Sequence, residues 1–171
     1  MSEHLPEYID PLRLARQERS VSGSYSLSAM HRLQAYLTDD QGSVEVSLQF
    51  GMDDNRLMVI RGELHAELGL LCQRCMEPMR LQVNVPMQLA IVDSEERADA
   101  LPDDYEPLVV TGDSSSLLEI VEDELILSLP IVAMHEQDQC TATGLLSSSD
   151  DDIEVVEKEN PFAVLSELKK H

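Results

Sequence analysis

The sequence predicts an α+β protein. We expect a curved antiparallel β-meander or open barrel, packed with N-terminal helices and one acidic helix and followed by a short C-terminal docking helix. Three observations lead to this expectation. Apolar and polar residues alternate in several stretches between residues 44 and 91, which is the period of a half-buried strand. Helix start signals lie on both sides of this region. A short apolar stripe follows a Ser- and Asp-rich stretch near the C-terminus.

The first 37 residues are predicted to form two helices. Asp10 is a good N-cap, and Pro11 occupies the first helical position, where proline fits without loss of a hydrogen bond. The small residues around Gly23 are expected to end this helix. Apolar residues at helical spacing over residues 26–37 predict the second helix.

Three arginines, Arg13, Arg16 and Arg19, recur every third residue in the first predicted helix. This spacing brings side chains to one side of a helix. They form the candidate basic patch of the N-terminal region, and contact with RNA or a partner is one interpretation. The other interpretation is that these arginines form a solvent-exposed helix face beside the acidic remainder of the protein.

Alternation over residues 44–50 predicts a first strand, and two long alternating runs follow it, over residues 58–70 and 81–91. Strands of this length are rare. We therefore expect bends or bulges at Gly62, Gly69 and Pro86. Because proline cannot donate to a strand ladder, Pro86 should lie at an edge or a bulge.

Residues 93–124 contain twelve Asp or Glu residues and one basic residue. After a loop and a short added strand, Ser116 and Glu119 form a capping-box pattern that begins a helix. Pro130 should end it. The polar face of this helix carries Glu119, Glu122 and Asp123, which are the candidate residues for binding a basic partner.

These patterns predict three regions. Residues 1–140 form a single α+β domain, residues 141–159 an acidic flexible linker, and residues 160–171 a short C-terminal helix. A short helix that follows a flexible linker is not stable alone in water. It should dock either on its own domain or in the groove of a partner.

The formal net charge is −21 at pH 7. Such a charge repels phosphate backbones and anionic membranes at long range, so unaided tight binding to either is disfavoured. A basic protein partner fits the charge better. The N-terminus shows no apolar signal-peptide core, and no apolar run is long enough to span a bilayer. A cytoplasmic location with reduced thiols is expected.

The turn between the two long runs carries Cys72 and Cys75, and Cys140 follows His135 by five residues. Three thiols and one imidazole complete the ligand set of a structural zinc site. Such a site would tie the hairpin tip to the segment after the acidic helix. The alternative is that no metal binds, with Cys72 buried at a strand end, Cys75 in a turn and Cys140 in a linker. A redox role is a weaker alternative.

Several motifs occur together in this chain: LCQRC at 71–75, LPDDYEP at 101–107, VEDELILSLP at 121–130 and NPFAVL at 160–165. In this order and spacing they resemble the YceD family of large ribosomal RNA subunit accumulation proteins. The resemblance implies a bacterial cytoplasmic protein needed for processing or accumulation of 23S ribosomal RNA. It implies a process rather than a mechanism, because the family carries no assigned catalytic residues.

Two functional hypotheses follow. The first is a non-enzymatic adaptor in ribosome biogenesis whose acidic surface binds a ribosomal protein or an RNA-processing protein. The second is a direct RNA-binding protein that uses the Cys hairpin and the N-terminal arginines. The candidate RNA contacts are Arg13, Arg16, Arg19, Arg74 and Arg80. No phosphate-binding loop, nucleophile elbow or HExxH motif suggests an enzyme.

Overall fold

The structure of the chain is a computed structural model that describes residues 5–112 and 114–142. The chain divides into two units after Cys140. The predicted acidic linker, from residue 143 onward, and the predicted C-terminal helix lie outside the described residues. The fold described below is that of the first unit.

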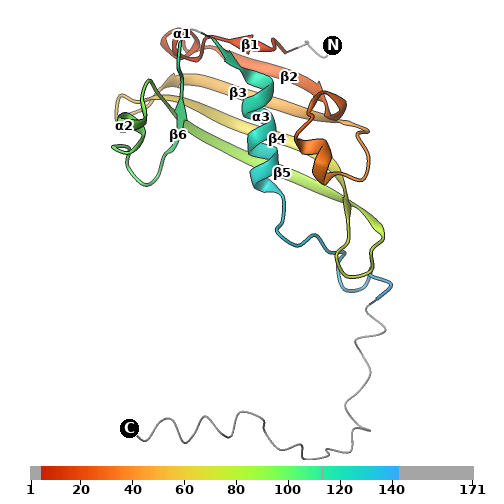
Figure 1. The fold of residues 1–171 in the computed structure, drawn as a ribbon. Coiled ribbons are helices and arrows are strands. Elements are labelled where there is room, and N and C mark those ends of the chain that lie inside the picture. The colour runs from red at the N-terminus through yellow and green to blue at the C-terminus, as the bar shows by residue number, and fades with distance from the viewer. Residues whose placement is uncertain (1–4, 113, 143–171) are drawn as a thin grey trace, which may run out of the picture. The chain divides into compact units, whose positions relative to one another are not determined.

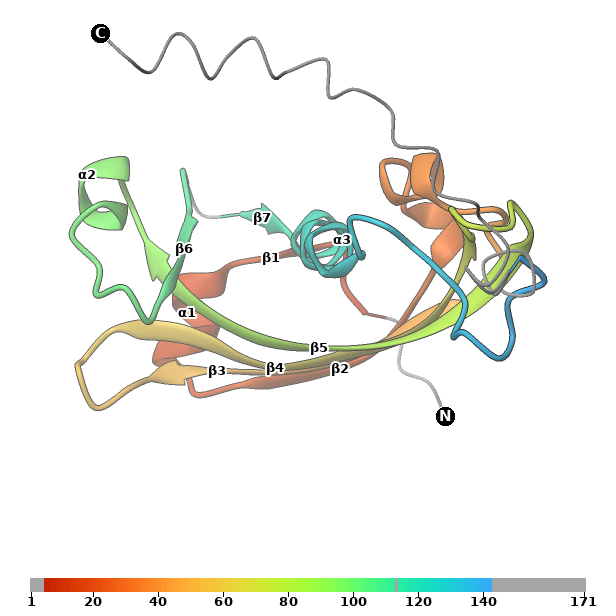
Figure 2. The same cartoon turned by 90° about the horizontal axis from the view of Figure 1, so that it is seen from below.

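An open five-stranded sheet forms the centre of this unit, in the order β2-β3-β4-β5-β6. Its strands are β2 (Ser20–Ser26), β3 (Ser43–Met52), β4 (Met58–Leu71), β5 (Pro78–Val92) and β6 (Glu106–Val109). Strands β2 to β5 are antiparallel neighbours, and β6 joins β5 in parallel. The α+β class and the antiparallel meander are therefore confirmed. Figure 2 shows that the sheet is strongly curved, and its edge strands β2 and β6 do not pair with each other, so no barrel closes.

The curvature arises without a bulge between β4 and β5, whose register is continuous from Val59 to Leu71. Gly62 allows β3 and β4 to approach closely, because a Cβ there would lie 2.0 Å from a backbone oxygen of β3. Pro86 pairs with Glu63 of β4, whereas β6 pairs only with residues 89–92 of β5. One side of β5 is therefore an edge at Pro86, as predicted.

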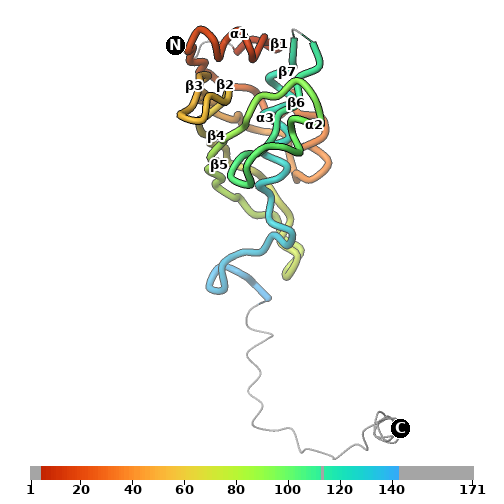
Figure 3. Tube along the Cα trace, turned by 90° about the vertical axis from the view of Figure 1, so that its left-hand side faces the viewer, coloured from red at the N-terminus to blue at the C-terminus, as the bar shows by residue number. Residues whose placement is uncertain are grey.

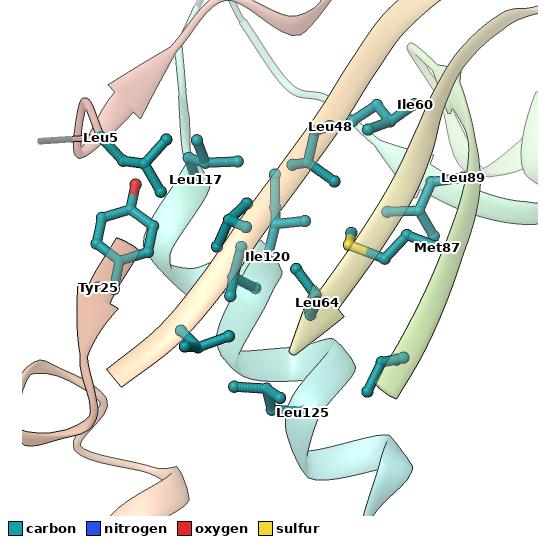
Figure 4. Packing of buried hydrophobic residues seen from close by; sticks show 14 of the residues in the cluster. Leu5, Tyr25, Leu48, Ile60, Leu64, Met87, Leu89, Leu117, Ile120 and Leu125 are labelled. Atoms are coloured by element: carbon teal, nitrogen blue, oxygen red, sulfur yellow. The ribbon is translucent and has the colours of Figure 1, made fainter. Parts of the chain in front are cut away.

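Helix α3 (Leu117–Ser128) lies in the concave face of the sheet (Figures 1 and 2). Ser116 accepts a hydrogen bond from the amide of Glu119 at 3.2 Å, and the helix ends before Pro130, so the predicted start and end are confirmed. Figure 4 shows the core between helix and sheet. Its labelled residues include Leu48, Ile60, Leu64, Met87, Leu89, Leu117, Ile120 and Leu125.

In the N-terminal region only the start of the first predicted helix is confirmed, and that helix ends at Arg16, before the small residues around Gly23, which lie in a strand. Strand β1 (Tyr8–Ile9) pairs with β7 (Ser115–Ser116), and helix α1 (Pro11–Arg16) begins at Asp10, whose carboxylate accepts from the amide of Arg13 at 2.8 Å. The second helix, predicted over residues 26–37, does not form.

Strand β2 and two short 3-10 helices, η1 (Leu27–Ala29) and η2 (Leu33–Tyr36), follow α1 in place of that helix. The physical reason lies in the apolar spacing. Leu27, Met30 and Leu33 recur every three residues and are fully buried. A 3-10 turn places residues three apart directly above one another, whereas an α-helix offsets each such pair by about 60°, so a run with strict spacing of three moves progressively around the helix.

The acidic loop region forms helix α2 (Glu95–Ala98) before β6. Tyr105, which precedes β6, donates a hydrogen bond to Asp53 in the β3–β4 turn. Asn55 of the same turn donates to the Tyr105 hydroxyl at 2.9 Å. These contacts connect the β3–β4 turn to the segment between α2 and β6.

Candidate metal centre

The β4–β5 turn places Cys72 and Cys75 close together. The amide of Cys72 donates to Glu77 at 3.0 Å, and the amide of Met76 donates to the carbonyl of Cys72 at 2.8 Å. Met76 adopts a left-handed conformation with φ of 60°, which allows the chain to reverse direction. The turn therefore brings two thiols to one side of the hairpin tip.

The segment after α3 runs alongside this tip (Figure 3). The amide of Gln73 donates to the carbonyl of Ala133 at 2.8 Å. Two residues later, the amide of His135 donates to the Cys72 sulfur at 3.4 Å. Backbone contacts therefore hold the segment against the turn independently of any metal.

The four predicted ligand residues come together in one cluster: Cys72, Cys75, His135 and Cys140. Their donor atoms all lie within 4.8 Å of one another, and Cys75 Sγ lies 3.3 Å from His135 Nδ1. Ligands placed tetrahedrally at about 2.3 Å from zinc would lie roughly 3.7 Å apart. A small contraction of this cluster would therefore give zinc-site geometry.

The electrostatics of the cluster favour a thiolate. Burial raises the pKa of the Cys72 thiol, but hydrogen bonds from the backbone amides of Cys75 and His135 outweigh it. A further hydrogen bond from the amide of Arg74 contributes in the same direction, and the pKa of Cys72 falls to about 5. Metal binding requires deprotonated cysteine, so the backbone already stabilises the form that a metal would bind.

The donor set suits a closed structural site. Three sulfurs and one imidazole nitrogen fill the four positions of tetrahedral zinc and leave none for a substrate. Cys72 and Cys140 are buried. None of the three cysteines, all within the described residues, forms a disulfide. The donor set therefore suits a cross-link between the hairpin tip and the segment after α3.

Both segments that form this centre also carry exposed apolar side chains. Ile131 is fully exposed, and Met76, Val132 and Met134 are also exposed. Ile131 and Val132 line a cavity of about 540 Å³, together with other mainly apolar residues of β4, of α3 and of the segment that follows α3. Clustered exposed apolar residues of this kind mark interaction surfaces more often than ordinary solvent-facing surface.

The predicted acidic docking residues lie on α3 but differ in their surroundings. Glu122 is buried, and one of its carboxylate oxygens accepts from the amides of Arg32 and Leu33 at 2.7 and 3.1 Å. The Arg32 guanidinium binds the other oxygen at 2.9 Å and Asp123 at 2.6 Å. Glu119 is exposed. Glu122 therefore anchors α3 to η2 and does not lie on a docking surface.

The surroundings of Glu122 determine its charge. Burial raises the pKa of Glu122, but the amide of Leu33 and the guanidinium of Arg32 hold it below its usual range. Sequence reasoning missed this role because Arg32 is 90 residues away in the chain, and no local pattern connects the two.

The predicted arginine contacts do not gather on one surface. Arg13 lies 4.0 Å from Asp10 at α1, whereas Arg80 pairs with Asp39 at 2.9 Å. Arg74 lies in the β4–β5 turn, with Nη2 3.6 Å from the Met134 sulfur. Arg19 follows the end of α1, because the chain turns at Glu18 with φ of 49°. The arginines are thus divided between both ends of the sheet.

The comparisons with known proteins agree on one family. The family model described as "Large ribosomal RNA subunit accumulation protein YceD" matches residues 60–169. The chain belongs to the YceD family. A protein of that same description from Haemophilus influenzae is 33% identical to this chain over 173 residues, and the alignment covers 97% of each protein. No solved structure matches the chain.

The part of the YceD chain that the structure describes has no helix that is both long and apolar enough to cross a bilayer. The family match begins in β4, so it includes the cysteine turn and α3. The resemblance expected from the sequence motifs is confirmed.

Proposed function

We propose that this YceD chain supports the accumulation of 23S ribosomal RNA as a non-enzymatic, cytoplasmic adaptor. Its partner would be a ribosomal protein or an RNA-processing protein. The family description connects the chain to the large ribosomal RNA subunit. The cysteine cluster supports the proposal, because its four donors suit a closed structural site and exposed apolar residues lie on the segments that carry it.

We propose that Cys72, Cys75, His135 and Cys140 hold one zinc ion. The ion would supply a cross-link between the hairpin tip and the segment after α3. The residues themselves position this cross-link. The β4–β5 turn supplies two thiols, and the backbone contact between Gln73 and Ala133 holds the segment after α3 in place. The cross-link would fix residues 131–134, whose apolar side chains face solvent.

The docking surface in this proposal combines apolar and acidic residues. Ile131, Val132 and Met134 would provide buried contact area, and exposed Glu119 together with the net charge of −21 would attract a basic partner. Asp123 is exposed as well, although Arg32 partly neutralises it. Glu122 contributes by anchoring α3 and not by contact with the partner.

The proposal is tested by metal analysis and affinity purification of the full chain. We expect about one zinc per chain in protein never exposed to chelator, in line with a closed four-ligand site. Ribosomal or RNA-processing proteins should co-purify, and charge reversal at Glu119 together with Ile131→Ser should weaken this recovery. Less than a tenth of a zinc per chain would exclude the metal centre. Unchanged recovery would exclude this docking surface.

Direct RNA binding is the competing function. The net charge of −21 opposes it at long range, and the candidate arginines are dispersed. A gel-shift titration with fragments of the 23S precursor separates the two functions. Sub-micromolar binding by the isolated chain at physiological salt would favour direct RNA binding over the adaptor.

A further inference from the structure

An arginine-rimmed cavity lies at the opposite end of β4 from the cysteine cluster. It has a volume of about 420 Å³ and lies between α1, the β3–β4 turn, the end of β5 and the α2 region. Figures 1 and 2 place these elements together at one end of the sheet. Arg16, Arg56 and Arg97 line it, together with apolar residues that include Leu57, Ile91 and Leu101.

The charge of this cavity is opposite to that of the chain. Its lining contains three arginines and one acidic residue, Asp93, although the chain carries 33 acidic residues and 12 basic ones. Arg97 pairs with Asp93 at 3.1 Å. Among the described residues, no carboxylate lies within ion-pair distance of the guanidinium of Arg16 or Arg56, whereas Arg32, Arg61 and Arg80 each have such a carboxylate. Two cations therefore remain available at the rim.

The position of Arg56 is held by the surrounding structure. Arg56 adopts a left-handed conformation with φ of 62°, which is unfavourable for a side chain of its kind. Asp53 supports the turn by accepting from the amide of Leu57 at 2.8 Å and from the Tyr105 hydroxyl. Strained residues persist only where their surroundings hold them, and they cluster at ligand sites. The Arg56 guanidinium therefore belongs to a turn that these hydrogen bonds hold in place.

We propose that this cavity binds one nucleoside phosphate unit, either as a free nucleotide or within single-stranded RNA. The guanidinium groups of Arg16 and Arg56 would bind the phosphate, because their planar donors match phosphate oxygens. The base would lie on the apolar lining beside Leu57 and Leu101, or against a guanidinium plane. The cavity volume lies within the range of small-ligand sites.

A nucleotide fits this site better than an acidic peptide. Both supply anionic oxygens, but only the nucleotide joins an anion to a flat, weakly polar body that could cover the apolar lining. The site is also compatible with the net charge of −21, because the contact is local. Two phosphate-binding cations release few counterions, so binding should depend only weakly on salt. The proposal does not depend on the metal centre or on the adaptor function.

The test is a binding titration with the full chain. Fluorescent nucleoside monophosphates, a short single-stranded oligoribonucleotide and an acidic peptide of equal charge are measured by anisotropy. We expect a nucleotide or the oligoribonucleotide to bind and the peptide not to compete. Binding of the monophosphates identifies a free-nucleotide site, whereas binding of the oligoribonucleotide alone identifies an RNA contact.

Variants locate the site. Arg16→Gln and Arg56→Asn should each weaken binding about tenfold, because a charge-assisted contact is lost. Asparagine tolerates the left-handed conformation at position 56. Arg80→Gln, which removes an arginine at the other end of the sheet, should change affinity less than twofold. Far-ultraviolet circular dichroism and thermal melts check that each variant folds.

Several results would overturn the proposal. They are absence of binding of both probes at millimolar concentration, unchanged binding by the variant that combines Arg16→Gln and Arg56→Asn, and displacement of the nucleotide by the acidic peptide at equal concentration. Co-purification of protein partners by the same variants is measured separately. Loss of nucleotide binding with unchanged partner recovery would show that nucleotide binding and the adaptor function are independent of each other.

Discussion

The two ends of β4 are stabilised by different chemistry. At its beginning, the β3–β4 turn is held by hydrogen bonds among the chain's own residues, chiefly Asp53 with Tyr105 and Leu57. At its end, the two thiols of the β4–β5 turn lie close to the His135 imidazole and the Cys140 thiol of the segment after α3, a set that suits a metal ion. β4 has 14 residues, or about 45 Å of strand at roughly 3.3 Å per residue. The two ends should therefore respond independently to mutation, metal and pH.

The largest expected effect is at the cysteine end. Cys72→Ser or His135→Ala should abolish the proposed zinc binding, and amide protection at Gln73 should fall because the segment around Ala133 would lose its cross-link. Metal analysis and hydrogen exchange measure both. His65→Ala, which changes an exposed histidine on the outer face of β4, is the matched control and should leave metal content unchanged. Full protection of Gln73 in the metal-free variant would show that the backbone contact alone holds this end.

The next effect concerns the anchor of α3 beside the same end. Glu122→Gln should lower the free energy of unfolding by about 2–4 kcal/mol, because a buried carboxylate that binds Arg32 and two amides is lost. Urea denaturation measures this. The pKa of Glu122 lies below its usual range, so its contribution is present above pH 4.5 and declines as the pH falls further. Asp123→Asn, which changes an exposed partner of the same arginine, should cost less than about 1 kcal/mol.

A smaller effect of opposite sign is expected on α3. Burial, together with the charges of Glu106 and Asp123, raises the pKa of Glu124 from 4.5 to about 7. As the pH rises, the unfolded chain releases this proton at a lower pH than the folded chain does. The free energy of unfolding therefore falls as the pH rises from about 4.5 through 7. Glu124→Gln should therefore stabilise the protein by about 1–2 kcal/mol at pH 8 and by almost nothing at pH 4. Urea denaturation at both values checks this, with Glu119→Gln as control, and a pH-independent difference would contradict it.

The smallest effect is expected at the arginine end. Tyr105→Phe removes the hydroxyl that donates to Asp53, so the β3–β4 turn should lose amide protection at Leu57 while Gln73 is unaffected. Hydrogen exchange resolves the two sites. Tyr36→Phe, at an exposed tyrosine, should change neither. A change at Gln73 in Tyr105→Phe would show that the two ends are coupled.

Local patterns predicted much of this structure. Period-two alternation located β3, β4 and β5, and the signals at Ser116 and Pro130 located α3. The pattern failed over residues 26–37, because apolar residues every three positions resemble a helix in sequence but form 3-10 turns here. The adaptor function, the docking residues and the binding of zinc stay predictions.

The cysteine cluster shows both the reach and the limit of local reasoning. Thiol and imidazole chemistry alone suggested a four-residue set, and the structure brings those donor atoms within 4.8 Å. No comparable signal pointed to Arg56 or Arg32, because an arginine in a sequence does not reveal whether a carboxylate lies opposite it.

The sequence by itself determined strands β3 to β6, the main helix, the overall acidity and the family, because each depends on residues close together in the chain or on their sum. The tertiary structure decided which charges are neutralised. It buried Glu122 against Arg32 and left Arg16 and Arg56 without a carboxylate within ion-pair distance among the described residues. Pairing across such separations depends on how α3, the N-terminal segments and the sheet pack together, and that packing follows from the burial of many apolar residues at once.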